Sequence, residues 1–197
     1  FNLPQPFNNE DLYKKLCITT LHGQNKDALA KTQPGNWKYD IVEAGYKMNM
    51  TDIMASIGLV ELARYESMIL PKRKHIFDTY TQAFKDFSWA VIPKYQTTEK
   101  TSSFHLYPLR IRNITEQQRD LIMAHIFEKQ VSVNVHFLPL PMTSFYKKKG
   151  YNIVDYPNTY NHFASEISLP VYVDLTDSQL QTVIEAIKTS VDEVLKS

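Results

Sequence analysis

The segment from Thr176 to Val194 constrains the fold of this 197-residue chain more than any other. Thr176 and Gln179 have the spacing of a capping box, in which the two residues satisfy backbone N–H groups at the start of a helix. Apolar residues then recur at the spacing of one helix face: Leu180, Val183, Ile184, Ile187, Val191 and Val194. Such a face needs another layer of structure to cover it, so the C-terminal part of the chain must contain a packed core.

The segments that could supply this layer alternate between strand-like and helix-like patterns. Strand-like or extended runs occupy residues 89–92, 103–111, 131–137 and 167–173. A second capping box, Thr115 with Gln118, begins a helix after the second run, and another helix pattern covers 156–165. This order predicts an α/β fold: a small α/β sandwich over residues 88–197, with a three- to four-stranded and mainly antiparallel sheet.

A long helical pattern precedes this domain. Thr51 is placed to cap it, and apolar residues then recur at helical spacing to about residue 87. Pro71 should kink the pattern, so we expect a long kinked helix over 51–87. Residues 1–50 contain one helix pattern, which we expect to be capped by Asn9 and to end near Gly23. They contain no strand-like run that could build a sheet, so we expect them to belong to a larger domain.

The composition excludes several classes of protein. Lys and Arg number 22 against 21 Asp and Glu, so no bulk charge attracts the chain to nucleic acid. None of the five glycines completes a GxGxxG or GxxxxGK loop, and the single Cys17 excludes a disulfide framework. The histidines are scattered without the spacing of a metal site, so we expect no metal. No segment reads as a membrane span, so we expect no membrane partner, and the single cysteine is compatible with the cytoplasmic location that we expect.

The stretch from Gly45 to Asp52, GYKMNMTD, is the strongest candidate for a binding loop. It places an aromatic ring, a Lys and an Asn directly before the expected N-terminus of the 51–87 helix. Backbone N–H groups, the helix dipole, a Lys charge and an Asn amide can together hold an anion. Many helices also begin after such a loop and bind nothing, so the residues alone leave both possibilities open.

His136 differs from the other histidines because it closes an expected strand and opens a proline-rich loop, VHFLPLP. Side chains at such strand ends commonly line clefts. A histidine that is merely satisfied in the core fits the same pattern, so the residues alone do not assign His136 to a site.

Five segments, taken together, carry a family resemblance. They are residues 21–29 (LHGQNKDAL), 37–66 (WKYDIVEAGYKMNMTDIMASIGLVELARYE), 102–111 (SSFHLYPLRI), 131–151 (VSVNVHFLPLPMTSFYKKKGY) and 163–187 (FASEISLPVYVDLTDSQLQTVIEAI). The combination of GY-x-x-x-MTD, VHF-x-P and E-x-SLP-x-Y resembles the DegT/StrS-type sugar aminotransferases, pyridoxal-phosphate enzymes of the aspartate-aminotransferase fold. Many members read GYN-x-R-MTD, whereas Lys47 and Asn49 stand at those places here, in a form that also occurs in the family.

The resemblance implies that the chain is the C-terminal half of a fold-type I pyridoxal-phosphate transferase. Residues 1–50 would be a remnant of the large cofactor domain with a dimer-facing loop, 51–87 the connecting helix, and 88–197 the small domain. Such enzymes are homodimers that move an amino group from glutamate to a nucleotide-linked keto-sugar. By the same resemblance, Tyr46, Lys47 and Asn49 would lie near the cofactor phosphate of the neighbouring subunit, and His136 near the nucleotide-sugar.

No segment of the chain resembles the one that carries the family's Schiff-base lysine, so the resemblance implies no catalytic residue within these 197 residues. We therefore expect the segment alone to be inactive. Two other interpretations remain open: a truncated, non-catalytic relative that acts as a binding or regulatory module, and a sugar dehydratase on the same scaffold in which that lysine is replaced.

Overall fold

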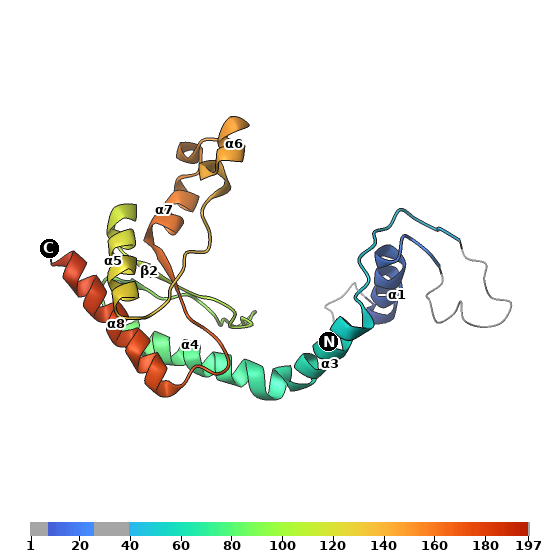
Figure 1. Cartoon of the computed structure of the whole chain (residues 1–197), viewed down its shortest axis with the longest axis horizontal. Coiled ribbons are helices and arrows are strands. Elements are labelled where there is room, and N and C mark those ends of the chain that lie inside the picture. Colours follow the sequence, from blue (N-terminus) through green and yellow to red (C-terminus); the bar gives the residue numbers. More distant parts are fainter. Residues whose placement is uncertain (1–7, 26–39, 197) are drawn as a thin grey trace. The chain divides into compact units, whose positions relative to one another are not determined.

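A computed structural model describes residues 8–25 and 40–196 of the chain. The chain divides into two compact units, one up to Ala63 and one from Arg64 onward, and each is described by itself. Figure 1 shows the helices and strands in sequence colours. The predicted segments 21–29 and 37–66 fall partly outside the described residues, at 26–29 and 37–39.

The first unit contains helix α1, Asn9–Thr20, and most of helix α3, Asp52–Arg64. We expected Asn9 to cap α1, but the cap is Asn8, whose side-chain oxygen accepts a hydrogen bond from the Glu10 N–H at 3.0 Å. The end of α1 is as predicted: Gly23 adopts a positive φ of 74° and its N–H donates to the Ile18 carbonyl at 2.9 Å. This is the left-handed conformation in which glycine closes helices.

The predicted long helix is realised as three consecutive helical elements: α3, a single wide π-helical turn over Tyr65–Ile69, and α4, Leu70–Phe84. The wide turn ends two residues before Pro71, and the hydrogen bond from the Leu70 N–H to the Tyr65 carbonyl spans five residues, as a π-helix requires. Proline has no N–H and its ring crowds the preceding turn, which accounts for a local change of helix type at the predicted kink.

The second unit is built on a three-stranded antiparallel sheet, counted over the described residues, in the order β1-β2-β3. Strand β1 is Ala90–Val91, β2 is Tyr107–Ile111 and β3 is Glu166–Leu169. The register pairs Ala90 with Ile111 and Tyr107 with Leu169. The α/β fold and the antiparallel sheet predicted from the sequence are therefore confirmed.

Helices α4, α5 (Glu116–Glu128) and α8 (Asp177–Leu195) share one core with this sheet, and α8 packs against both α4 and α5 (Figure 1). Both predicted capping boxes are present, at Thr115 with Gln118 and at Thr176 with Gln179. The apolar face of α8 is buried, as its spacing required. At the centre Phe77 meets Tyr107 edge to face, with ring centroids 5.0 Å apart, a favourable aromatic geometry.

The segment between α5 and β3 contains several shorter helices. They are the 3₁₀ turns Leu140–Met142 and Ile153–Asp155, helix α6 (Ser144–Lys148) and helix α7 (Pro157–Ser165). Helix α7 agrees with the predicted helix behind Pro157, and it packs against α5 and β2.

The strand predicted over 131–137 is wrong, because this segment makes only a single β-bridge, between Asn134 and Ser168. Side chains take the backbone donors that a ladder would need. The Asn134 side-chain oxygen accepts the Val135 N–H at 2.8 Å, and the Glu166 carboxylate accepts the His136 N–H at 3.0 Å. Side-chain acceptors that take backbone N–H groups compete with regular sheet pairing.

Within residues 8–25 and 40–196, no helix is long and apolar enough to cross a lipid bilayer.

Candidate functional site

Backbone hydrogen bonds hold the loop from Val42 to Met48 against the C-terminal end of α1. The Tyr46 N–H donates to the Thr19 carbonyl at 2.7 Å, and the His22 N–H donates to the Tyr46 carbonyl at 3.0 Å. The Met48 N–H reaches the Thr20 carbonyl at 2.9 Å. Because these bonds involve only backbone atoms, they fix the path of the loop while leaving its side chains free to face outward.

The Glu43 side chain adds a polar anchor between this loop and α1. Its carboxylate accepts hydrogen bonds from the Lys15 ammonium and from the Thr19 hydroxyl, the latter at 2.7 Å. These two bonds, with Lys15 as the larger influence, hold the pKa of Glu43 below its ordinary value. The anchor is therefore strongest when Glu43 is ionised.

Tyr46, Lys47 and Asn49, the residues predicted to serve the cofactor, are all exposed on this fastened loop. Among the described residues, neither the Lys47 ammonium nor the Asn49 amide makes a hydrogen bond or ion pair. Helix α3 begins three residues after Asn49, and the Thr51 hydroxyl lies 3.5 Å from the Met54 N–H in its first turn. The loop thus presents an unengaged cation and an unengaged amide just before a helix N-terminus, donors that suit a phosphate group.

Helix α3 itself has no buried residue, although its sequence is strongly apolar. Its large hydrophobic side chains are more than half exposed: Ile53, Met54, Ile57, Leu59, Val60 and Leu62. A cluster of exposed apolar side chains on one element commonly marks a contact with other protein.

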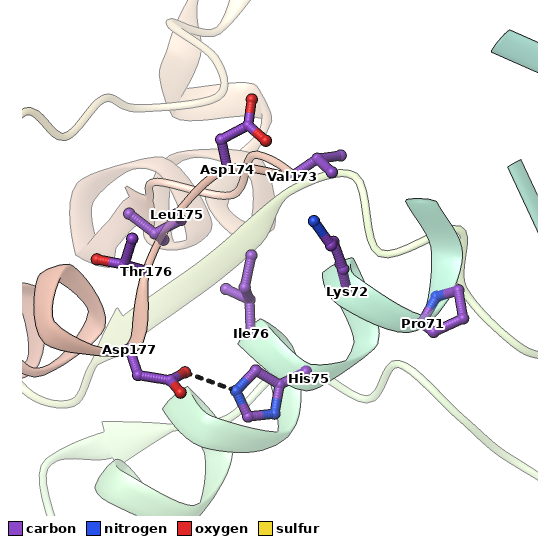
Figure 2. Close-up of a pocket in the computed structure, with 9 residues that line it drawn as sticks. All are labelled: Pro71, Lys72, His75, Ile76, Val173, Asp174, Leu175, Thr176 and Asp177. Carbon is purple, nitrogen blue, oxygen red and sulfur yellow. Dashed lines mark hydrogen bonds and ion pairs between the residues drawn. The ribbon is translucent and has the colours of Figure 1, made fainter. Parts of the chain in front are cut away.

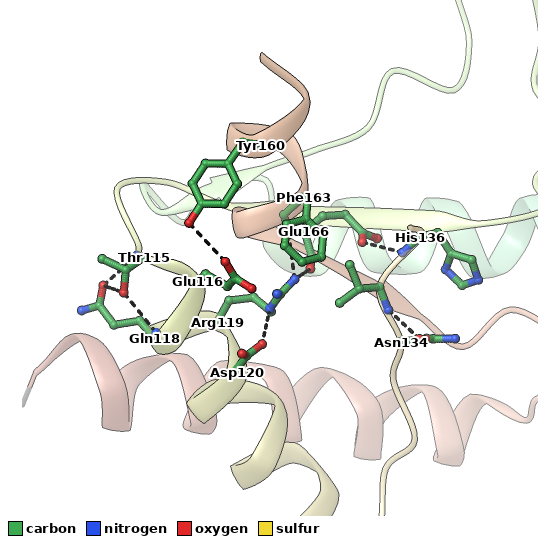
Figure 3. Close-up of polar contacts among 11 residues, drawn as sticks. Thr115, Glu116, Gln118, Arg119, Asp120, Asn134, His136, Tyr160, Phe163 and Glu166 are labelled. Carbon is green, nitrogen blue, oxygen red and sulfur yellow. Dashed lines mark hydrogen bonds and ion pairs between the residues drawn. The ribbon is translucent and has the colours of Figure 1, made fainter. Parts of the chain in front are cut away.

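His136 lies in the second unit, where its backbone and ring are held by two residues of β3. Its backbone N–H donates to Glu166 Oε2 at 3.0 Å, and its ring Nδ1 lies 2.8 Å from Ser168 Oγ. Figure 3 shows the Glu166 carboxylate reaching the His136 backbone, with the imidazole turned away from it. The ring is half-buried, so it is neither a core residue nor a freely rotating surface side chain.

Glu166, Ser168 and Arg119 are polar residues of the same region that we did not predict. All three are buried, with Glu166 fully so. Arg119 donates to the Phe163 carbonyl at 2.7 Å and to the Glu166 carbonyl at 3.4 Å, while its Nε bonds Asp120 at 2.7 Å (Figure 3). For Glu166 and Ser168 the signal in the sequence was two polar residues, two positions apart, in the otherwise apolar segment Glu166–Leu169, because polar groups in a buried strand need partners.

Two hollows of the second unit contain none of the predicted site residues. One, of about 660 Å³, lies between the start of α4 and the loop before α8 (Figure 2). It carries Lys72 and Asp174 as well as the pair His75 Nε2 and Asp177 Oδ1, 2.9 Å apart. The other, of about 330 Å³, is lined by Leu140, Pro141, Thr159 and the rings of Tyr146, Tyr151 and Tyr156.

No group of three or more His, Cys, Asp or Glu side chains that could hold a metal occurs among the described residues. Tyr46, Lys47 and Asn49 belong to the first unit and His136 to the second. The three loop residues therefore lie on one loop of the first unit, whereas His136 bonds to Glu166 and Ser168 in the second unit.

Comparison with known proteins identifies the class to which this fold and these residues belong. The sequence description of the DegT/DnrJ/EryC1/StrS aminotransferase family matches residues 6–188. The chain therefore belongs to this family, as the motifs had predicted.

Two curated relatives illustrate the match. The chain is 32% identical over 184 residues to the spore coat polysaccharide biosynthesis protein SpsC of Bacillus subtilis, covering 91% of this chain and 47% of SpsC. It is 27% identical over 191 residues to the UDP-4-amino-4,6-dideoxy-N-acetyl-beta-L-altrosamine transaminase of Campylobacter jejuni, covering 95% of this chain and 47% of the transaminase. The chain thus spans about half the length of the curated relatives it matches.

Among solved structures, the chain matches Spr1654 of Streptococcus pneumoniae, described as a sugar aminotransferase. Its PMP form superposes with a TM-score of 0.83 at 41% identity, covering 98% of this chain and 48% of Spr1654. The PLP form of the same protein gives a TM-score of 0.81 at 38% identity, with 98% and 47% coverage. The fold is therefore that of the sugar aminotransferases, and pyridoxal phosphate is the cofactor with which this family works.

Proposed function

We propose that this chain is the C-terminal part of a pyridoxal-phosphate aminotransferase that moves an amino group from glutamate to a nucleotide-linked keto-sugar. The observation that carries the proposal is the match to Spr1654 over 98% of the chain at 41% identity, together with the family match over residues 6–188. The C. jejuni relative, which is named for its UDP-linked sugar, supports the nucleotide-sugar class of substrate.

The cofactor loop in this proposal is formed by Tyr46, Lys47 and Asn49. Their fit to pyridoxal phosphate rests on the Lys47 ammonium and the Asn49 amide before α3, which bond to no other residue in the described part of the chain, because a phosphate group needs donors and positive charge. When bound, the cofactor supplies the electron sink for the transfer of nitrogen. The loop residues would hold its phosphate, and the backbone bonds to α1 would keep the loop in place.

We further propose that the cofactor held by this loop belongs to a second subunit of a homodimer. Support comes from α3, which follows the loop directly and exposes several large apolar side chains while burying none. In the proposed dimer the rest of the enzyme and its second copy cover this surface, and burial of such side chains would contribute on the order of 1.5 kcal/mol or more each.

His136 is the proposed contact to the nucleotide-sugar. It is half-buried, and its orientation is set by Glu166 and Ser168 rather than by packing in the core. A ring held in this way can offer its remaining nitrogen to a ligand. We propose that the enzyme works in the cytoplasm, where the exposed Cys17 would remain a free thiol.

The test has two parts. The protein that carries this chain, taken at its full encoded length, is assayed with pyridoxal phosphate, glutamate and a UDP-linked keto-sugar, and we expect an amino-sugar product. The 197-residue chain is then mixed with pyridoxal phosphate and scanned for visible absorbance of a bound cofactor, and we expect none.

A stoichiometric adduct of the cofactor at one lysine of the 197-residue chain, with amino-sugar formation, would overturn the assignment of catalysis to residues outside it. Loss of water from the sugar, in place of amino transfer by the full-length protein, would instead favour a dehydratase. Failure of the full-length protein to bind the cofactor or react would favour a non-catalytic relative.

A further inference from the structure

Glu166 is a fully buried carboxylate whose two oxygens are both used. Oε2 accepts the backbone N–H of His136 at 3.0 Å, and Oε1 accepts the hydroxyl of Ser168. Both partners lie at the edge where the Asn134–Ser168 bridge joins the His136 segment to β3. The carboxylate therefore holds this segment and the Ser168 side chain at the same time.

The position of the Ser168 hydroxyl is fixed by the sheet. Ser168 pairs with Pro108 in the β2–β3 ladder, and its N–H donates to the Asn134 carbonyl at 2.7 Å. Glu166 and Ser168 are two residues apart on one strand, so their side chains project from the same face. The carboxylate and the hydroxyl thus meet because of strand geometry and not because of a flexible loop.

The hydrogen-bond donors available decide which atoms of Glu166, Ser168 and His136 carry a proton. A serine hydroxyl has one proton, and an ionised carboxylate can only accept. The Ser168 proton is committed to Glu166 Oε1, so the Ser168 oxygen can act only as an acceptor toward His136 Nδ1, 2.8 Å away. Nδ1 must then carry a proton, and in the neutral imidazole the lone pair is left on Nε2.

We propose that Glu166 and Ser168 are positioning residues that hold His136 as the Nδ1–H tautomer, so that Nε2 is presented as a hydrogen-bond acceptor to the substrate. This rests on the proposed function, in which His136 contacts a nucleotide-sugar. It also narrows the group that His136 recognises: an O–H or N–H donor, such as a sugar hydroxyl, an acetamido N–H or an imide N–H of the base. A phosphate oxygen, which is an acceptor, would meet a lone pair and is disfavoured.

The tautomer can be measured directly by long-range ¹H–¹⁵N correlation on the ¹⁵N-labelled chain in mildly alkaline buffer, because the two tautomers are forms of the neutral imidazole. The His136 signals are assigned by their loss in His136→Gln. We expect a proton-bearing Nδ1 and a bare Nε2. The Nε2–H tautomer in the unmodified protein would overturn the proposal.

Two variants test whether Glu166 and Ser168 set the tautomer of His136. In Glu166→Gln the new amide can donate to the Ser168 oxygen, which releases the serine proton to Nδ1, so the ring should switch to the Nε2–H tautomer. Ser168→Ala removes the fixed acceptor and should give a mixture of both tautomers. The matched control is Ser165→Ala, because the Ser165 hydroxyl is exposed and donates only to the Asn161 and His162 carbonyls. Unchanged signals from the other histidines report that each variant is folded, and an unchanged His136 tautomer in both test variants would overturn the proposal.

The affinity for a UDP-linked sugar distinguishes a failure of this inference from a failure of the proposed function. In the full-length protein, Ser168→Ala and Glu166→Gln should each weaken binding of a UDP-linked sugar about three- to tenfold, the loss expected for one hydrogen bond. Neither should weaken it further in a His136→Ala background. If the tautomer switches as expected but even His136→Ala leaves the affinity unchanged, the role of His136 in the proposed function fails while the tautomer assignment stands. If His136→Ala weakens binding and the two β3 variants do not, the positioning role fails.

Discussion

Gly23 and Gly45 approach each other so closely that a Cβ on Gly45 would lie 2.2 Å from the Gly23 backbone nitrogen. A Cβ on Gly23 would lie 1.8 Å from the Glu43 carbonyl oxygen, and Gly23 also has a positive φ of 74°. The end of α1 and the loop that carries Tyr46, Lys47 and Asn49 can therefore lie in contact only because the residue at the contact point in each segment is a glycine. This contact explains how exposed residues on an irregular loop can have a fixed path.

Gly45→Ala should loosen this loop, because the added methyl group meets backbone atoms that cannot rotate away. Overpacking of this kind costs roughly 1–3 kcal/mol. Hydrogen exchange of the Tyr46 and Met48 amides should accelerate accordingly. The control is Gly58→Ala in α3, where a Cβ meets nothing within 4 Å and alanine favours the helix. Equal exchange rates in Gly45→Ala and the unmodified protein would contradict the close contact.

Lys47→Ala and Asn49→Ala should each lower the affinity of the full-length protein for pyridoxal phosphate about tenfold or more. Loss of a hydrogen bond to a charged group costs roughly 1.5–3 kcal/mol. Cofactor affinity is measured by titration of the cofactor-free protein. Lys148→Ala is the matched control, since Lys148 is an exposed lysine of α6 outside the proposed loop. Unchanged cofactor binding in both loop variants would remove these residues from the site.

His136→Ala should raise the KM of the full-length protein for the sugar nucleotide and leave its Tm nearly unchanged. The ring is half-buried and makes a single side-chain hydrogen bond among the described residues, so little packing is lost. His162→Ala, which removes an exposed histidine on α7, should alter neither quantity. A large fall in Tm without a change in KM would assign His136 a structural role.

The stability of the second unit should fall at high pH because of its buried tyrosines. Burial raises the pKa of Tyr107 to about 12 and also raises that of Tyr80. The folded state keeps these protons to higher pH than the unfolded state, so the free energy of unfolding decreases as pH rises from about 10 to about 12. For Tyr107 alone the loss amounts to roughly 2–3 kcal/mol.

Urea unfolding across this pH range measures the effect. Tyr107→Phe should flatten the alkaline decrease while lowering stability near neutral pH by about 1 kcal/mol, because the hydrogen bond between the tyrosine and the Thr81 hydroxyl at 3.0 Å is lost. Tyr151→Phe, at an exposed ring, should leave the decrease intact. An unaltered alkaline slope in Tyr107→Phe would show that Tyr107 does not titrate as its burial requires.

The sequence alone determined the elements whose signals are local. The capping boxes at Thr115 and Thr176, the buried face of α8 and the disturbance at Pro71 each depend on residues within a few positions of one another. The motifs also led to the family, and the family to the fold and to pyridoxal phosphate. Local hydrogen bonds and helical periodicity form the same way in any surroundings, so they can be read without coordinates.

Only the tertiary structure decided the features that need a distant partner. Residues 131–137 have a strand pattern, yet pairing stops at Asn134. The Asn134 side chain takes the Val135 N–H, and Glu166, thirty positions away, takes the His136 N–H. Position 45 must lack a side chain because the Gly23 backbone lies against it, and the His136 ring nitrogen meets a serine on β3. A donor or a backbone contact is satisfied by whichever group the fold brings to it, and the spacing of residues along the chain does not contain that information.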